Sequence, residues 1–202
     1  MKNEKNKKEL VIHKLKKFIT SGYIPSRSNK EYDVRTSFIS NCFIHACFNL
    51  TDKQLHSFDG NELFEIMKHI DHSKLPTDEE IKDSLFSVVK ATGLNIERIE
   101  KNHLCNNNQW IVAFYLGARR YSLELSVRRV YEDYHFMLKE RDGGWSEKCG
   151  TSSEINITKN PPISYESNGN VYILQGYYLI TNPYAEFTNN RTIVEQKEER
   201  TL

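Results

Sequence analysis

The feature that most constrains the fold is a change in hydrophobic period near the middle of the chain. Before residue 94, apolar residues recur every three to four positions, as they do from Val11 to Ile19, which predicts amphipathic helices. After it, dense or alternating apolar runs predict strands, for example over residues 110–116 and 171–180. Helices followed by strands indicate an α+β fold, in which an N-terminal helical part packs on a C-terminal antiparallel sheet.

Several helices are expected in the first half of the chain. The first pattern begins near residue 11 and stops at Gly22 and Pro25. A second helix is expected from about Cys42 to residue 50, with Ser40 or Asn41 as its cap. The other helical segments are residues 51–54, 61–70 and 76–93, and residues 21–36 are expected to form a loop.

The second half of the chain predicts a sheet within a single domain. Its expected strands are residues 94–99, 110–116, 121–127, 133–140, 145–148 and 171–180. A tight turn at residues 141–144 joins two of them into a hairpin. A chain of 202 residues with 38% hydrophobic side chains suits one core, so we expect residues 1–187 to be one domain. Residues 1–22 would be an accessory N-terminal helix of it, and residues 188–202 a flexible polar tail.

The charge composition argues against some classes of function. The 28 basic side chains nearly balance 27 acidic ones, and a net charge of +1 gives no overall field to attract nucleic acid. No apolar run is long enough to span a membrane, and the basic N-terminus leads into an amphipathic segment rather than the apolar stretch of a signal peptide. We therefore expect no nucleic acid partner, no membrane span and a chain that is cytoplasmic as synthesised. The oligomeric state stays open.

The cysteines indicate reduced thiols rather than a disulfide framework. Cys42, Cys47, Cys105 and Cys149 are too few and too irregularly spaced to staple a domain of this size. Cys42 and Cys47 with His45 between them resemble half of a zinc site, but no second pair with zinc-like spacing follows. A small zinc domain is therefore the weaker alternative, and no metal or organic cofactor is expected.

Cys42 and His135 are the residues most suited to chemistry. Cys42 follows a helix-start signal, and a helix N-terminus together with an imidazolium favours the thiolate of such a cysteine. His135 opens an apolar strand in the second half, where an imidazole could serve as the base. Each residue alone is more often a core thiol or a satisfied histidine. Their order along the chain, a helix-borne cysteine and then a strand-borne histidine, favours a nucleophile and its base.

These segments resemble papain-like cysteine hydrolases. Residues 41–46 (N-C-F-I-H-A) are similar to the N-C-aromatic-x-x-A nucleophile segment of papain-like domains. Residues 133–136 (D-Y-H-F) with 144–150 (G-W-S-E-K-C-G) are similar to the Y-H-F-Y-R…G-x-W-S-H-K-P-G signature of a bacterial group of these domains, and the later G-Y-Y segment resembles that group's closing strand. The resemblance extends from about residue 35 to residue 180. Glu147 stands where the group usually has His, and Cys149 where it has Pro.

The hairpin register predicts which residues lie near His135. A two-residue turn within residues 141–144 would place His135 opposite Gly150 or Ser152. Glu147 would then pair several residues away. We therefore expect Glu147 not to orient the imidazole.

A third residue must accept the imidazole N–H and fix its tautomer. Among the polar residues past the hairpin we favour Asn156, because the resembling group often has an Asn at the aligned position. Glu154 is an alternative within reach, and Asp133, on the strand face of His135, is a further one. Asn41 is expected to help stabilise the oxyanion, together with the backbone N–H of Cys42.

The resemblance implies a cysteine hydrolase that acts on a peptide or amide bond of a protein or peptide substrate. Cys42 would attack the carbonyl, and His135 would protonate the leaving amine and then activate water. Proteolysis, deamidation, transglutamination and acyl transfer all share such a site and stay open. By the same resemblance the chain looks like a bacterial or phage product that acts on another protein, such as an effector or toxin exported by a specialised secretion system. The competing hypothesis is a catalytically inactive papain-like scaffold that serves as a protein-interaction module.

Overall fold

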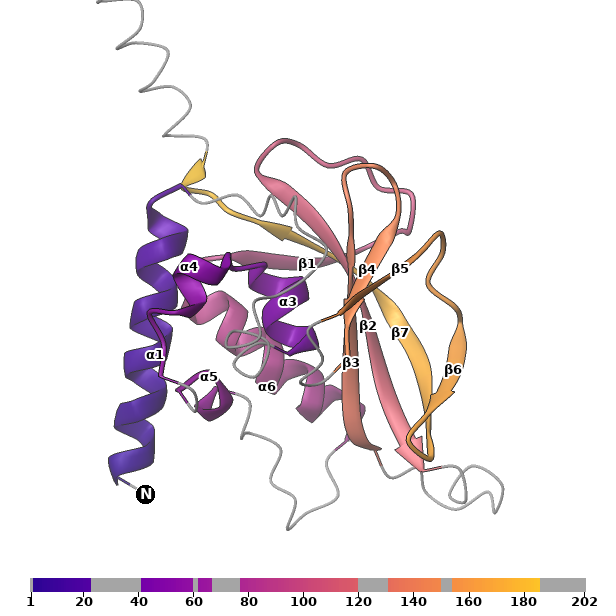
Figure 1. The fold of residues 1–202 in the computed structure, drawn as a ribbon, viewed down its shortest axis with the longest axis horizontal. Coiled ribbons are helices and arrows are strands. Elements are labelled where there is room, and N and C mark those ends of the chain that lie inside the picture. The colour runs from indigo at the N-terminus through magenta and orange to yellow at the C-terminus, as the bar shows by residue number, and fades with distance from the viewer. Residues whose placement is uncertain are drawn as a thin grey trace, which may run out of the picture.

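The computed structural model describes residues 2–22, 41–59, 62–66, 77–119, 131–149 and 154–185. In this part of the chain, helices lie on one side of a seven-stranded antiparallel sheet (Figure 1). The helices are α1 (Lys2–Thr20), α3 (Cys42–Phe48), α4 (Asp52–Leu55), α5 (Glu62–Glu65) and α6 (Asp78–Ala91). The strands are β1 (Asn95–Ile99), β2 (Gln109–Arg119), β3 (Tyr131–Lys139), β4 (Trp145–Lys148), β5 (Ile155–Thr158), β6 (Ser164–Ser167) and β7 (Asn170–Thr181). The α+β class predicted from the sequence is confirmed.

The sheet is built around three long strands, with β2 lying between β7 and β3. The strand order is β1-β7-β2-β3-β4-β5, and β6 pairs with β7 off this path. The β3–β4 ladder consists of three pairs, Met137 with Glu147, Leu138 with Ser146 and Lys139 with Trp145. β3 begins at Tyr131, six residues before its first pair with β4 at Met137. His135 therefore lies in the part of β3 that is no longer paired with β4.

Two apolar clusters lie on opposite faces of the sheet. The larger one fills the space between helices and sheet, where Phe136 of β3 packs against Phe43 of α3 with ring centroids 5.5 Å apart. The smaller one lies on the other face and contains Tyr115 and Met137. Because successive side chains of a strand point to opposite faces, His135 shares the second face with Met137 while Phe136 points at the helices.

Side-chain caps fix where the helices begin. At α6, the Thr77 hydroxyl accepts the N–H of Glu80 at 3.2 Å, and the Glu80 carboxylate accepts the N–H of Thr77 at 2.7 Å. Thr51 and Gln54 form the same reciprocal box at α4. Each box satisfies backbone donors that a helix leaves unpaired at its N-terminus. The helix starts expected near residues 51 and 76 are thus found.

The sequence missed two strands, and some of its predictions cannot be compared with the structure. β5 and β6 are only four residues long. In β5 the alternation of Ile155 and Ile157 with polar residues is too short to stand out, and β6, which is mostly exposed, shows no apolar alternation. The first helix begins at Lys2, earlier than its apolar pattern. The expected strand 121–127, helix residues 67–70, loop residues 23–36 and tail 188–202 lie outside the described residues. Among the helices that the structure describes, none has the length and apolar character needed to cross a membrane.

Candidate active site

Helix α3 presents Cys42 as its first residue because Asn41 caps it. The Asn41 side-chain oxygen accepts the N–H of Ile44 at 3.0 Å, and Asn41 itself has an extended backbone. At the other end Asn49 adopts a left-handed conformation (φ 43°), and its N–H bonds the carbonyl of Ile44 at 2.9 Å. All seven residues of this short helix are buried. The position of Cys42 is therefore set by a cap at each end of α3.

Cys42 meets β3 where β3 and β4 separate. Its thiol donates to the carbonyl of Tyr134 with a sulfur-to-oxygen distance of 3.9 Å, and the residue is 6% exposed. Tyr134 precedes the first pair of the β3–β4 ladder, which begins at Met137. The sulfur thus lies at the edge of β3, beside the backbone that carries His135.

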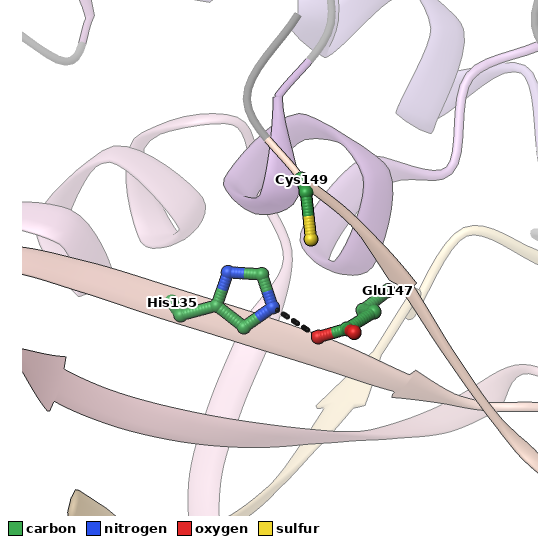
Figure 2. A group of neighbouring side chains, drawn as sticks. All are labelled: His135, Glu147 and Cys149. Atoms are coloured by element: carbon green, nitrogen blue, oxygen red, sulfur yellow. Dashed lines mark hydrogen bonds and ion pairs between the residues drawn. The ribbon is translucent and has the colours of Figure 1, made fainter. Parts of the chain in front are cut away.

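His135 is buried and joined to a residue on each side. Its Nε2 lies 2.8 Å from Oε2 of Glu147, and Cys42 is close enough to act on the pKa of its ring through charge and hydrogen bonding. Figure 2 shows one ring nitrogen directed at the Glu147 carboxylate and the other pointing away from it. Since Nε2 is used by Glu147, Nδ1 is the atom left for Cys42.

Burial alone would lower the pKa of His135, because it penalises the imidazolium. The charges and hydrogen bonds of Cys42 and Glu147 outweigh burial and raise the pKa of His135 to about 10. On the other side of the pair, the hydrogen bond from His135 lowers the pKa of the Glu147 carboxyl against the opposing effect of burial. An imidazolium next to a carboxylate is therefore the favoured state at neutral pH.

Asn156 secures the carboxylate rather than the imidazole. It is paired with Glu147 across the β4–β5 ladder, and its side-chain nitrogen donates to Oε1 of Glu147 at 3.5 Å. The same nitrogen lies 3.9 Å from the sulfur of Cys149. The described contacts therefore run from Cys42 to His135, then to Glu147, and only then to Asn156.

The prediction that Glu147 lies out of reach of His135 is wrong, and the cause is the hairpin turn. Residues 140–144 form a five-residue loop closed by hydrogen bonds from Glu140 N to Gly144 O (2.8 Å) and from Gly143 N to Glu140 O (3.1 Å). The prediction from the sequence rests on a two-residue turn. The longer loop pairs Met137 with Glu147, and a register change of one residue moves a side chain to the other face of a sheet. The expected partners Gly150 and Ser152 lie outside the described residues.

The other predicted residues have different partners. Asp133 accepts from the Tyr172 hydroxyl at 2.6 Å and from the N–H of Tyr134 at 2.8 Å, so its carboxylate is held away from the role of orienter. Glu154 is exposed just before β5. Asn41 uses its side chain to cap α3 and also hydrogen-bonds the Tyr134 side chain. A substrate oxyanion would have to compete for that amide, and the oxyanion role of Asn41 stays a prediction.

Three tyrosines surround the imidazole, and the sequence analysis did not find them. Tyr165, Tyr172 and Tyr115 have ring centroids 6.0, 6.2 and 6.4 Å from that of His135. Tyr165 and Tyr172 are stacked with their planes 8° apart. Tyr115 could have been predicted from alternation along β2, whereas Tyr165 belongs to β6, which gave no signal. These rings lie around an imidazole that is itself buried, with 7% of His135 exposed.

The same face carries a group of possible metal ligands. One donor atom each from His135, Glu147 and Cys149 lie within 4.8 Å of one another, the single such group of three found in the part of the chain that the structure describes (Figure 2). Cys149 is exposed at the end of β4 and its side chain points toward the other two.

The arrangement is suited to thiol nucleophilic chemistry. A sulfur, an imidazole that bonds it and a carboxylate that holds the imidazole are the parts by which a cysteine is activated and a leaving group protonated. In comparisons with known proteins, no family model matches this sequence and no curated protein is significantly similar to it.

Proposed function

We propose that this protein is a papain-like cysteine hydrolase that cleaves a peptide or amide bond of a protein substrate. The observation that carries the proposal is the continuous set of contacts from Cys42 through His135 to Glu147. These residues come from α3, β3 and β4, a helix-borne nucleophile beside an antiparallel sheet, which is the layout of a papain-like domain. The carboxylate takes the part of the third residue, in place of the Asn156 that the sequence favoured.

The reaction follows from these positions. The Cys42 thiolate attacks the carbonyl carbon, and the tetrahedral intermediate collapses to a thioester as the C–N bond breaks. The His135 imidazolium gives its proton to the departing amine, then accepts a proton from the water that attacks the thioester. Hydrolysis releases the carboxylic acid and restores the thiolate and imidazolium. Glu147 keeps Nε2 protonated throughout, so that Nδ1 faces the sulfur.

The environment of His135 supports an active centre over an inactive scaffold. Glu147 departs from the resembling signature, yet its carboxylate reaches the imidazole at 2.8 Å and is itself held by Asn156. The His135 imidazolium and the Glu147 carboxylate need each other, because a single buried charge without its partner is strongly unfavourable. On this proposal Glu147, although it departs from the signature, supplies the third residue of the site. We also propose that the substrate is a protein and that the chain acts as an exported effector.

Alkylation kinetics test the nucleophile directly. An ordinary thiol with a pKa near 8.5 is only about 0.3% thiolate at pH 6, so iodoacetamide labels it slowly there. Cys42 is 6% exposed whereas Cys105 and Cys149 are exposed, so exposure alone predicts that Cys42 is labelled last of the three. The proposal predicts the opposite order at pH 6, in protein kept metal-free with a chelator, by site-resolved mass spectrometry.

Two variants make this test specific. His135→Ala should abolish the preference for Cys42 while labelling of the exposed Cys105 stays the same. The fully buried Cys47 serves as an internal indicator of unfolding, because it is labelled only when the core opens. Labelling that follows exposure in the wild type, or a Cys42 preference that survives His135→Ala, would contradict the proposal.

A second experiment identifies the bond that is broken. Wild-type protein and its Cys42→Ala variant are incubated with a mixture of cellular proteins, and new N-termini and changed Gln or Asn side chains are mapped by mass spectrometry. New N-termini that need Cys42 indicate proteolysis, and side-chain conversion indicates deamidation or acyl transfer. Identical patterns from both proteins would contradict hydrolase activity and favour the interaction module.

A further inference from the structure

We propose that His135, Glu147 and Cys149 form a binding site for a borderline-soft divalent cation, of which Zn²⁺ is the best fit. A nitrogen, a carboxylate oxygen and a sulfur from these residues lie within 4.8 Å of one another (Figure 2). Imidazole, carboxylate and thiolate are the three ligand types that proteins use for zinc. The three-ligand set leaves a fourth tetrahedral position for water.

The separations are close to those that zinc requires. Zinc bonds of about 2.0 to 2.3 Å in a tetrahedron place the ligand atoms about 3.3 to 3.6 Å apart. His135 Nε2 and Glu147 Oε2 are now 2.8 Å apart, held by their hydrogen bond, and the sulfur lies within 4.8 Å of both donors. Side-chain movements of about 1 Å would therefore separate the His135 and Glu147 atoms, and bring the Cys149 sulfur closer to them, to the spacing of zinc ligands.

The sheet holds the three ligands on one face. The β3–β4 register puts Glu147 and His135 on the same face, and Cys149, the first residue after β4, directs its side chain toward both of them (Figure 2). Burial decreases from His135 through Glu147 to Cys149, which is exposed. An ion can thus approach from solvent through Cys149 and reach the imidazole last.

Asn156 provides the supporting contact that such sites usually have. Its side-chain nitrogen lies 3.5 Å from the carboxylate of Glu147 and 3.9 Å from the sulfur of Cys149. A donor shared by two ligands holds both in position, as the hydrogen-bonded residues behind metal ligands commonly do. This site makes no use of the Cys42 and Cys47 spacing that resembles half of a zinc motif, and Cys47 is fully buried.

Zinc at this position would inhibit the proposed hydrolase. A cation bound to Nε2 takes the atom by which Glu147 holds the imidazolium, and His135 could then no longer carry a proton to the leaving amine. This inhibitory effect rests on the proposed function. Binding of the ion does not, because it needs only the three ligands and can be measured without any substrate.

Metal binding is tested on the full chain freed of metal by a chelator and then exchanged into buffer. Zn²⁺ is titrated in competition with a chromophoric chelator, and Co²⁺ is used as a spectroscopic probe of thiolate ligation. We expect one equivalent of Zn²⁺ per chain and a cobalt-thiolate charge-transfer band. Cys149→Ser should remove the band and weaken zinc binding at least tenfold, whereas Cys105→Ser, at an exposed cysteine elsewhere, should change neither.

Two results would overturn the inference. One is no zinc binding by the wild type at micromolar concentration. The other is unchanged binding by Cys149→Ser, and if Cys42→Ser then abolished binding, the ion would be placed on the proposed nucleophile. Folding of each variant is checked by circular dichroism, and Glu147→Gln gives an independent second test of the ligand set. Alkylation of Cys42 in chelator-treated protein reports on the hydrolase separately, so either proposal can fail while the other stands.

Discussion

Met137 and Glu147 are paired across the β3–β4 ladder, which places the Glu147 carboxylate diagonally across from His135 on the same face of the sheet. This one pairing decides which residue orients the imidazole. Had the ladder shifted by one position, Glu147 would point toward the helices, and the histidine would face the sheet surface without it. The register of a hairpin thus sets the chemistry of the site.

Glu147 is expected to matter more than Asn156 for the reactivity of Cys42. Glu147→Gln leaves a similar shape but removes the charge that holds the imidazolium, and we expect labelling of Cys42 at pH 6 to slow at least tenfold. Asn156→Ala removes only the residue behind the carboxylate, and a smaller loss of about two- to fivefold is expected. Alkylation reactions quenched at a series of times measure the rate of Cys42 labelling in both variants. The reverse order would restore Asn156 as the orienting residue.

The same pair should make stability depend on pH in a defined window. The pKa of His135 is raised to about 10, so the stabilisation by its imidazolium is complete below about pH 6.5 and is lost as the pH rises through 10. The pKa of Glu147 is lowered, so the stabilisation by its carboxylate is complete above about 4.5, its ordinary value, and is lost as the pH falls below that. Both contributions are present between about pH 5 and 6.5.

In that window we expect metal-free Glu147→Gln to unfold with about 1 to 3 kcal/mol less free energy than the wild type, as is typical of a hydrogen bond to a charged group. The difference should shrink at pH 3 and above pH 10. Burial raises the pKa of Tyr115, Tyr165 and Tyr172, so these neighbours stay neutral across this window. Urea unfolding at several pH values measures the difference, and a difference that does not vary with pH would argue against the ion pair.

Tyr165 is expected to protect the bond between His135 and Glu147 from water. Its ring lies edge-on to the imidazole with centroids 6.0 Å apart. In the wild type the ring N–H at Nε2 should exchange slowly enough to give a downfield proton NMR signal. Tyr165→Ala should abolish that signal, and Tyr165→Phe, which keeps the ring, should retain it. Loss of the signal in both variants would point to the hydroxyl rather than the ring.

Phe136 should be among the costliest side chains to truncate. It is fully buried between Phe43 and Phe114, with ring centroids 5.5 and 4.9 Å away. Phe136→Ala should lower the free energy of unfolding by about 3 to 5 kcal/mol, since it removes a large side chain from a packed core. Leu104→Ala is the control, because Leu104 is 89% exposed and should change stability by less than about 0.5 kcal/mol. Urea denaturation measures both, and equal effects would contradict the described core.

The sequence predicted the elements of the site better than their pairing. The cap at Asn41 and the strand around His135 are local signals, and both were found where the pattern indicated. The choice of Glu147 depends on whether the turn has two residues or five, and residues 141–144 are compatible with either. Tyr165 was missed for a related reason, because β6 is held by pairing with β7 rather than by its own sequence.

Cys42 and Tyr134 are in contact although they are 92 positions apart along the chain. Cys42, the proposed nucleophile, gains its contacts with β3 only after that strand has formed and α3 has docked against it. A growing polypeptide therefore carries an ordinary thiol until its last third has left the ribosome. Unfolding the chain therefore separates Cys42 from these partners and leaves an ordinary thiol, and the contacts return only when the chain refolds.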